Sequence, residues 1–303
     1  MSRLYGGIEA GGTKFVCMVG TGPDDVVDET RFATTLPDET IRTTLAFFKP
    51  FVRRGELAAV GIASFGPVDL NPVSPTFGHI TTTPKPDWCQ VDLMGRVQRA
   101  LGLPVAFDTD VNAAAYGEYH WNPDNQTLDP FLYVTVGTGI GVGVLANREP
   151  IHGLLHCEAG HFAIPHDWQK DPFAGVCPYH GDCLEGLASG PSMAQRWGRP
   201  AEALTNHQGA WELEADYIAL AVVNLIYAYS PQRIVLGGGV AQHLGLHRMV
   251  RERVRRHLGG YIQSPMVADR IDNYVVMPYL GNRSGVLGAI AMAHSVAEKG
   301  SWG

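Results

Sequence analysis

One pattern occurs twice in this chain and restricts its fold more than any other feature. A predicted strand leads into a glycine-containing turn, and a second predicted strand leads out of it. The turns cover residues 11–14 and 137–141. Further strand and helix patterns follow each copy, so the sequence predicts a duplicated α/β unit with a cleft between the copies.

The remaining periodicity agrees with an α/β fold. The expected strands cover residues 4–9, 15–19, 26–34, 58–63, 105–107, 131–136, 142–145 and 233–236. The expected helices cover residues 37–52, 111–119, 184–197, 212–229 and 284–297. A Pro/Thr-rich loop over residues 66–88 is too long to be a simple connection in a compact domain.

A polar segment near residues 122–129 marks the expected domain boundary. The length of 303 residues fits two domains of ordinary size. We therefore expect an N-terminal domain over residues 1–121 and a C-terminal domain over 122–283. The last helix, about 284–298, is expected to pack back on the N-terminal domain.

Three glycine turns share one chemistry. Glycine lets backbone N–H groups approach an anion closely, and Thr13, Lys14 and Thr138 add hydroxyl donors and a charge. Any one turn is equally explained as a tight hairpin; three together, the third at 237–239, favour phosphate binding. The spacings of a P-loop and of a dinucleotide fingerprint are absent, so the actin and sugar-kinase architecture fits better.

Composition excludes several other classes of protein. A net charge of -7 with no run of basic residues argues against a nucleic-acid partner. The apolar stretches fall short of the roughly 18 residues of a membrane span. No signal peptide is recognisable, and five cysteines in a chain of this size suggest reduced thiols in a cytoplasm.

Asp110 stands where a predicted strand ends and a helix begins. Phosphoryl transfer to a hydroxyl needs a carboxylate that accepts the alcohol proton and a metal that neutralises the phosphates. Asp110 could supply that carboxylate at the mouth of a cleft. Taken alone, it is as well explained as a helix N-cap.

Several motifs in register resemble the ROK family of bacterial sugar kinases, and the resemblance covers nearly the whole chain. They are Gly-Gly-Thr-Lys at 11–14, Asp-x-Asn-Ala-Ala at 110–114, Gly-Thr-Gly-Ile-Gly at 137–141, Glu-x-Gly-His at 158–161 and Cys-Leu-Glu at 183–185. Residues 8–15, 64–69 and 82–85 resemble the fructokinase branch in particular.

The resemblance implies two actin-like (ribonuclease H-like) domains and a role for each matching residue. Asp110 would be the general base. The residues expected to bind sugar hydroxyls are Asn112, Glu158, His161 and Glu185. Those expected to bind ATP are Gly11, Gly12, Thr13, Lys14, Thr138 and Gly139 at the phosphates, and Gly238 and Gly239 at the adenosine.

One position departs from many relatives. The resemblance implies Mg²⁺ with ATP, and Glu9 stands where many relatives carry the Asp that helps to position this ion. Glutamate keeps the charge and reaches further, so Glu9 and Asp110 are the candidates for this role.

Four metal-ligand residues lie within one short segment. His161, Cys177, His180 and Cys183 have the spacing H-x15-C-x2-H-x2-C, which favours a closed tetrahedral Zn²⁺ site of structural type. Ordinary core cysteines and surface histidines are the alternative, and other possible ligands are His152, His156 and His166. The segment 156–186 would be a zinc-binding insertion, and one imidazole nitrogen of His161 would remain for the sugar.

The sequence therefore predicts a cytoplasmic ATP-dependent hexose kinase, with D-fructose as the expected substrate and fructose 6-phosphate as the product. A glucokinase, or a broad hexokinase acting also on mannose, is the alternative within this class. A sugar-sensing protein without catalysis is a third option, but Asp110 is present. The family resemblance also suggests a homodimer; neither a nucleic-acid nor a membrane partner is expected.

Overall fold

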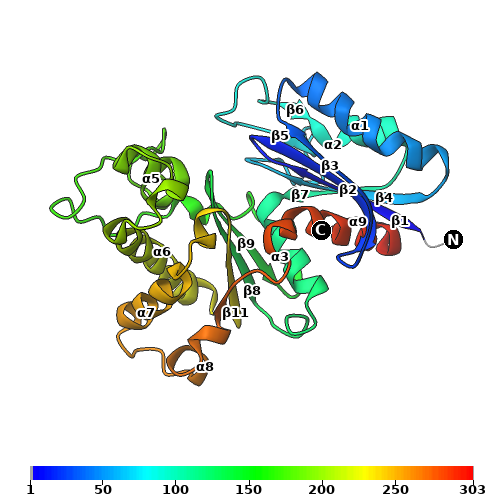
Figure 1. Cartoon of the computed structure of the whole chain (residues 1–303). Coiled ribbons are helices and arrows are strands. Elements are labelled where there is room, and N and C mark those ends of the chain that lie inside the picture. Colours follow the sequence, from blue (N-terminus) through cyan, green and yellow to red (C-terminus); the bar gives the residue numbers. More distant parts are fainter. Residues whose placement is uncertain (1–2, 303) are drawn as a thin grey trace. The chain divides into compact units, whose positions relative to one another are not determined.

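Two compact units make up the computed structural model, which describes residues 3–302 (Figure 1). Unit 1 contains residues 3–127, Gly143–Cys157 and 283–302. Unit 2 contains Leu128–Val142 and Glu158–Asn282. Two five-stranded sheets are present among the described residues, and with the helices they confirm the predicted α/β class.

The first sheet has the order β3-β2-β1-β4-β7. Strand β1 pairs antiparallel with β2 through the predicted hairpin and parallel with β4, which pairs parallel with β7. The bounds are β1 Leu4–Ala10, β2 Lys14–Gly22, β3 Asp25–Ala33, β4 Leu57–Ser64 and β7 Val105–Thr109.

Helices cover both faces of this sheet. They are α1 Pro37–Arg53, α2 Leu93–Leu101, α3 Asp110–Trp121 and α9 Ser284–Lys299. A Cβ at Gly6 would lie 2.8 Å from Phe48 of α1, and one at Gly7 would lie 2.6 Å from the carbonyl oxygen of Val286 in α9. Successive residues of a strand point to opposite faces, so α1 and α9 cover opposite faces (Figure 1).

Helix α9 packs on the sheet and on α3 with almost no space between backbones. A Cβ at Gly61 of β4 would overlap the carbonyl oxygen of Ala289, and one at Gly288 would overlap the carbonyl oxygen of Ala113 in α3. Only glycine permits this approach. The last helix of the chain is thereby held against the first strands and against the helix that begins with Asp110.

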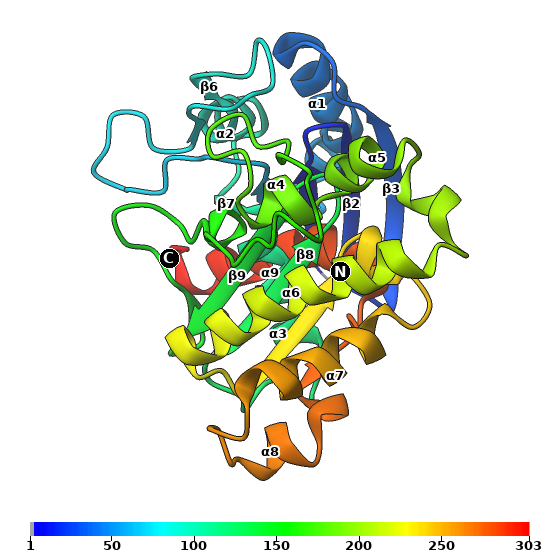
Figure 2. The same ribbon diagram turned by 90° about the vertical axis from the view of Figure 1, so that its left-hand side faces the viewer.

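The second sheet has the order β10-β9-β8-β11-β12. Its strands are β8 Phe131–Val136, β9 Ile140–Ala146, β10 Glu149–Pro150, β11 Arg233–Gly237 and β12 Val275–Val276. The other helices are α4 Leu184–Ala188, α5 Gly190–Trp197, α6 Gln208–Tyr229, α7 Leu246–Leu258 and α8 Pro265–Ala268. Helix α6 packs against α7 and α4 (Figure 2).

The helix expected over residues 184–197 is two helices. Ser189 has an extended backbone, with φ −77° and ψ 162°, and separates α4 from α5. Its hydroxyl accepts a hydrogen bond from the Ser192 amide, and Pro191 lies in the first turn of α5. A serine cap followed by a proline is a start signal for a new helix, and the strong apolar periodicity conceals it.

The long loop over residues 66–88 contains part of a small sheet formed by β5 His79–Ile80 and β6 Val91–Asp92. Trp88, at its end, is fully buried and donates a 2.9 Å hydrogen bond from Nε1 to the Thr35 carbonyl. None of the helices among residues 3–302 is long and apolar enough to cross a membrane.

The close packing of α9 leads to a stability prediction. Gly288→Ala should lower the free energy of unfolding by about 1–3 kcal/mol, because the added methyl group overlaps the Ala113 carbonyl. Urea titration followed by circular dichroism measures the change. Gly209→Ala is the control, because the nearest atom to its new Cβ is 3.8 Å away. Equal stability of both variants would show that α9 does not pack as described.

Candidate active site

The turn between β1 and β2 in unit 1 exposes its tip. The Gly11 amide donates to the Lys14 carbonyl at 3.0 Å, and the Thr34 hydroxyl donates to the Gly11 carbonyl at 2.7 Å. A Cβ at Gly11 would lie 2.7 Å from the Lys14 carbonyl oxygen, whereas Gly12 has no atom within 4 Å of its added Cβ. Thr13 and Lys14 are exposed, so hydroxyl and ammonium donors face solvent at this tip.

Glu9 lies at the end of β1 beside the N-terminus of α9. A Cβ at Gly285 would lie 2.8 Å from the Glu9 carboxyl carbon. Burial raises the pKa of Glu9, while the charge of Lys14 and a hydrogen bond from the Val286 amide act in the opposite direction. The first turn of a helix favours an anion, so α9 offsets part of the cost of burying this carboxylate.

Asp110 is the first residue of α3 and is not its cap. Thr109 is the N-cap, and its hydroxyl accepts a 3.1 Å hydrogen bond from the Asn112 amide. One carboxylate oxygen of Asp110 accepts from the Val111 amide at 2.9 Å. Asp110 is partly exposed at the carboxyl end of β7. The alternative interpretation of Asp110 as the N-cap is therefore wrong, because Thr109 occupies that position.

Asn112 is buried and bound to a second carboxylate. The residue is 1% exposed, and its Nδ2 donates to Oδ1 of Asp108 at 2.8 Å. The same oxygen accepts from the Thr109 amide at 2.7 Å. Its amide nitrogen is thus used within the protein, and this contact favours a role in holding the start of α3.

Oδ2 of Asp108 has two distant partners that sequence reasoning missed. It lies 2.9 Å from His152 Nε2 and accepts from Trp302 Nε1 at 3.3 Å. His152 and Trp302 are 44 and 194 residues away in the chain. The motif around Asp110 includes Asp108, but no local pattern identifies these partners.

The pKa values of His152 and His156, four residues apart after β10, shift in opposite directions. Burial lowers the pKa of His152, but the hydrogen bond and charge of Asp108 outweigh it, so the net shift is upward. Burial lowers the pKa of His156, whose Nε2 accepts from the Val68 amide at 3.2 Å. Both histidines are therefore engaged within unit 1.

The turn between β8 and β9 in unit 2 is bound to Glu185. Oε2 of Glu185 accepts a 2.9 Å hydrogen bond from the Ile140 amide, and a Cβ at Gly139 would lie 2.7 Å from the same oxygen. The Gly190 amide donates to the Gly137 carbonyl at 2.8 Å. Thr138 is exposed at the tip, as Thr13 is in the first turn.

The third glycine turn lies beside the second. Gly238 has φ +92°, and a Cβ there would overlap the backbone of Val136 in β8. Gly239 has open space around its Cβ position, and its amide nitrogen is 3.7 Å from the Cβ position of Gly137. The residues predicted for phosphate and for adenosine in unit 2 therefore share one edge of the sheet.

Glu158 has a neighbouring carboxylate in unit 2. Partial burial and the charge of Glu185 raise the pKa of Glu158 to about 7. Glu158 remains exposed to solvent. A carboxyl group that titrates near neutrality can donate or accept a hydrogen bond.

The predicted zinc ligands come together in unit 2. The ligand atoms of His161, Cys177, His180 and Cys183 all lie within 4.8 Å of one another. The Cys177 sulfur is 3.6 Å from His180 Nδ1 and 3.8 Å from His161 Nδ1, which is 3.5 Å from the Cys183 sulfur. A tetrahedral Zn²⁺ with sulfur and nitrogen ligands requires separations of about 3.6 Å. This donor set fits Zn²⁺.

His161 directs Nδ1 toward this cluster, which leaves its Nε2 for another partner. The alternative ligand His166 has other contacts, with Nδ1 3.0 Å from Asp182 and Nε2 2.9 Å from the Asp171 carbonyl. His152 and His156 are engaged in unit 1, so the predicted ligand set is the group that the structure assembles.

The predicted site residues thus form two sets. Unit 1 contains Glu9, the 11–14 turn, Asp110 and Asn112. Unit 2 contains the 137–141 and 237–239 turns, Glu158, Glu185 and the metal-ligand cluster.

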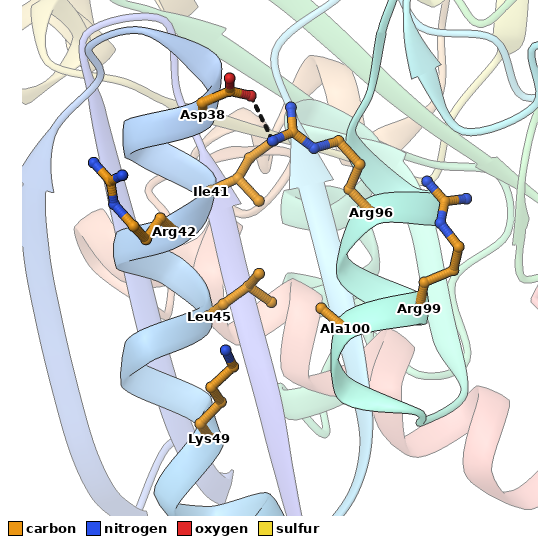
Figure 3. A pocket seen from close by; sticks show the side chains of 8 residues that line it. All are labelled: Asp38, Ile41, Arg42, Leu45, Lys49, Arg96, Arg99 and Ala100. Carbon is orange, nitrogen blue, oxygen red and sulfur yellow. Dashed lines mark hydrogen bonds and ion pairs between the residues drawn. The ribbon is translucent and has the colours of Figure 1, made fainter.

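A separate pocket of about 390 Å³ lies between α1 and α2 and is lined by none of these residues (Figure 3). Arg96 is bound to Asp38 at 2.6 Å across its upper end. Arg42 and Arg99 point to opposite sides (Figure 3), so their charges do not converge on one ligand position.

Comparison with known proteins identifies relatives over the whole length. The family description "ROK family" matches residues 5–296. A fructokinase of Streptococcus mutans is 44% identical over 302 residues, covering 99% of this chain and 100% of its own. A fructokinase of Zymomonas mobilis is 41% identical over 302 residues, covering 98% of both chains.

The fold also matches solved structures. A ROK hexokinase from Thermus thermophilus superimposes with a TM-score of 0.78 at 24% identity, covering 98% of this chain and 100% of that one. At this identity the match concerns the fold, and it agrees with the predicted actin-like architecture.

The metal-ligand cluster leads to a prediction about zinc. We expect the purified protein to carry one Zn²⁺ per chain, and Cys177→Ser to lose it, because a closed site needs all four ligands. Loss of the metal should lower the thermal midpoint by on the order of 5 °C. Mass spectrometric metal analysis and calorimetry measure both effects. Cys89→Ser, at an exposed thiol, is the control. Full zinc content in Cys177→Ser would show that the ligand set is wrong.

The His152–Asp108 pair leads to a prediction about pH. A raised histidine pKa contributes stability that is fully present below the unfolded value of 6.5 and is lost as pH rises through the folded value. His152→Gln keeps an N–H donor and removes the titration. Wild type should therefore exceed this variant in unfolding free energy by more at about pH 6 than at about pH 9. A difference independent of pH would show that His152 is not charged in the pair.

Proposed function

Because this chain belongs to the ROK family, we propose that it transfers the γ-phosphoryl group of ATP to D-fructose and forms fructose 6-phosphate. One observation carries the choice of fructose: the 41–44% identity to fructokinases over nearly the full length of both partners.

Asp110 is the general base in this proposal. It lies at a strand end, is partly exposed, and has one oxygen on the Val111 amide. The other oxygen can accept the proton of the acceptor hydroxyl as the phosphoryl group is transferred. The fixed start of α3 provides the orientation on which proton transfer depends.

The glycine turns bind ATP. In unit 1 the donors are the Gly12 amide, the Thr13 hydroxyl and the Lys14 ammonium, and Gly11 shapes the turn through its bond to the Lys14 carbonyl. In unit 2 the donors are at Thr138 and Gly139. Gly238 and Gly239 approach the adenosine without a Cβ in the way. Glu9 and Asp110 are the candidate residues near Mg²⁺, which when bound with ATP would offset the negative charge of the phosphates.

The hexose is bound mainly from unit 2. Glu158, His161 through Nε2, and Oε1 of Glu185 offer hydrogen-bonding atoms, since Glu185 already uses Oε2 on the Ile140 amide. The zinc cluster joins the segments that carry His161 and Glu185, and so orients these side chains. Asn112 acts from the interior of unit 1 through Asp108.

The cellular location and the oligomeric state are the remaining parts of the proposal. None of the five cysteines forms a disulfide, which is consistent with the reducing cytoplasm that we propose as its location. A homodimer is expected on the family resemblance, and gel filtration with light scattering tests it.

The direct test is ADP release with ATP and Mg²⁺ against fructose, glucose, mannose and N-acetylmannosamine. We expect the highest kcat/KM with fructose. A preference for glucose or mannose would keep the reaction and replace the substrate. No turnover on any of the four sugars would contradict the proposed function.

Asp110→Asn tests the mechanism. The change removes the base with little change in volume, so we expect kcat to fall by roughly 10²- to 10⁴-fold while the thermal midpoint stays close to that of wild type. Asp24→Asn, at an exposed turn of unit 1, is the matched control and should retain full turnover. If Asp110→Asn kept near-normal kcat, Asp110 would not be the base.

A further inference from the structure

Asp108 is a fully buried carboxylate, two residues before Asp110, that is not among the residues proposed to bind ATP, sugar or metal. Burying a carboxylate is costly unless hydrogen bonds and opposite charge replace water. Asp108 has such partners on both oxygens: the Thr109 amide and Asn112 Nδ2 on Oδ1, and His152 Nε2 and Trp302 Nε1 on Oδ2.

These partners belong to three separate segments. Thr109 and Asn112 are at the start of α3, His152 is two residues after the end of β10, and Trp302 follows α9. Oδ1 therefore holds the turn that carries Asp110, and Oδ2 holds the two distant segments. Both oxygens belong to one planar carboxylate, so contacts that hold Oδ2 restrict where Oδ1 can lie.

Further contacts fix the positions of His152 and Trp302, the two distant partners of Asp108. His152 forms an antiparallel bridge with His156, whose ring accepts from the Val68 amide at 3.2 Å. The Trp302 ring packs edge-on against Tyr116 of α3 with centroids 4.7 Å apart. Gly300, with φ +78°, ends α9 and turns the chain before Trp302.

We propose that Asp108 positions the catalytic base, and that His152 and Trp302 act through Asp108 to fix the start of α3. The proposal rests on the proposed role of Asp110. Asp108 and Trp302 are positioning residues: neither needs to touch the sugar or ATP, and each sets the direction in which the Asp110 carboxylate points.

Loss of this support should reduce catalysis more than binding. Small misplacements of a catalytic group can reduce rates by about 100-fold. Asp108→Asn keeps the shape but replaces one acceptor oxygen with an NH2 group that faces other donors, so we expect kcat to fall by about 10- to 100-fold. Trp302→Phe keeps a ring on Tyr116 and loses only the N–H, so its kcat should fall less, by roughly 3- to 10-fold.

The experiment compares Asp108→Asn, Trp302→Phe and the control Trp168→Phe, an indole that is 55% exposed in unit 2. Two properties are measured on folded, zinc-loaded protein: kcat and KM for fructose, and hydrogen exchange of the Val111, Asn112 and Ala113 amides. We expect lower kcat, KM for fructose within about twofold, and faster exchange in the first two variants only.

A purely structural role predicts another result: a lower thermal midpoint with unchanged kcat per folded molecule. Unchanged kcat, or lowered kcat with unchanged exchange at α3, would overturn the proposal. Should Asp108→Asn not fold, Trp302→Phe decides alone. If wild type phosphorylates none of the hexoses, the proposed function fails, and exchange still shows whether Asp108 fixes this turn.

Discussion

Backbone contact between α9 and the first sheet is the constraint on which unit 1 depends. Gly61 and Gly288 allow α9 to touch β4 and α3 without intervening side chains. This approach brings the N-terminus of α9 to Glu9, keeps α3 against the sheet, and leads the chain after Gly300 to Asp108. Three carboxylates with different environments result. Glu9 is next to helix amides, Asp108 is buried among four donors, and Asp110 is partly open to solvent.

Unit 2 is organised around the hydrogen bond between Glu185 and the Ile140 amide. Glu185 follows Cys183, one of the four clustered candidate zinc ligands, by two residues, and Ile140 follows the Thr138–Gly139 turn. The turn proposed to bind phosphate, the carboxylate proposed to bind sugar and the metal-ligand cluster therefore lie next to one another. We infer that zinc acts on catalysis by limiting the motion of Glu185 and His161.

The sequence predicts those parts of this protein that depend on local patterns. The two strand–turn–strand units, the α/β class and the four clustered ligands follow from residue type and spacing, and the structure contains each of them. The break at Ser189 was missed because apolar periodicity continues through it, although Ser189 and Pro191 carry the signal. The partners of Asp108 could not be predicted, because contacts across 44 and 194 residues have no periodicity. Asn112 is recognisable from its motif, but its burial against Asp108 follows only from the tertiary structure.

We propose that Asp110 is the base and that Glu158, His161 and Glu185 bind the sugar in the transfer of phosphate from ATP to fructose. The most direct test is a competition experiment with equal concentrations of ¹³C-labelled fructose and glucose, ATP and Mg²⁺, with products identified by carbon and phosphorus NMR. We expect fructose 6-phosphate as the main product, formed together with one ADP per phosphorylated sugar. Mainly glucose 6-phosphate, or ADP and inorganic phosphate without a sugar phosphate, would contradict it.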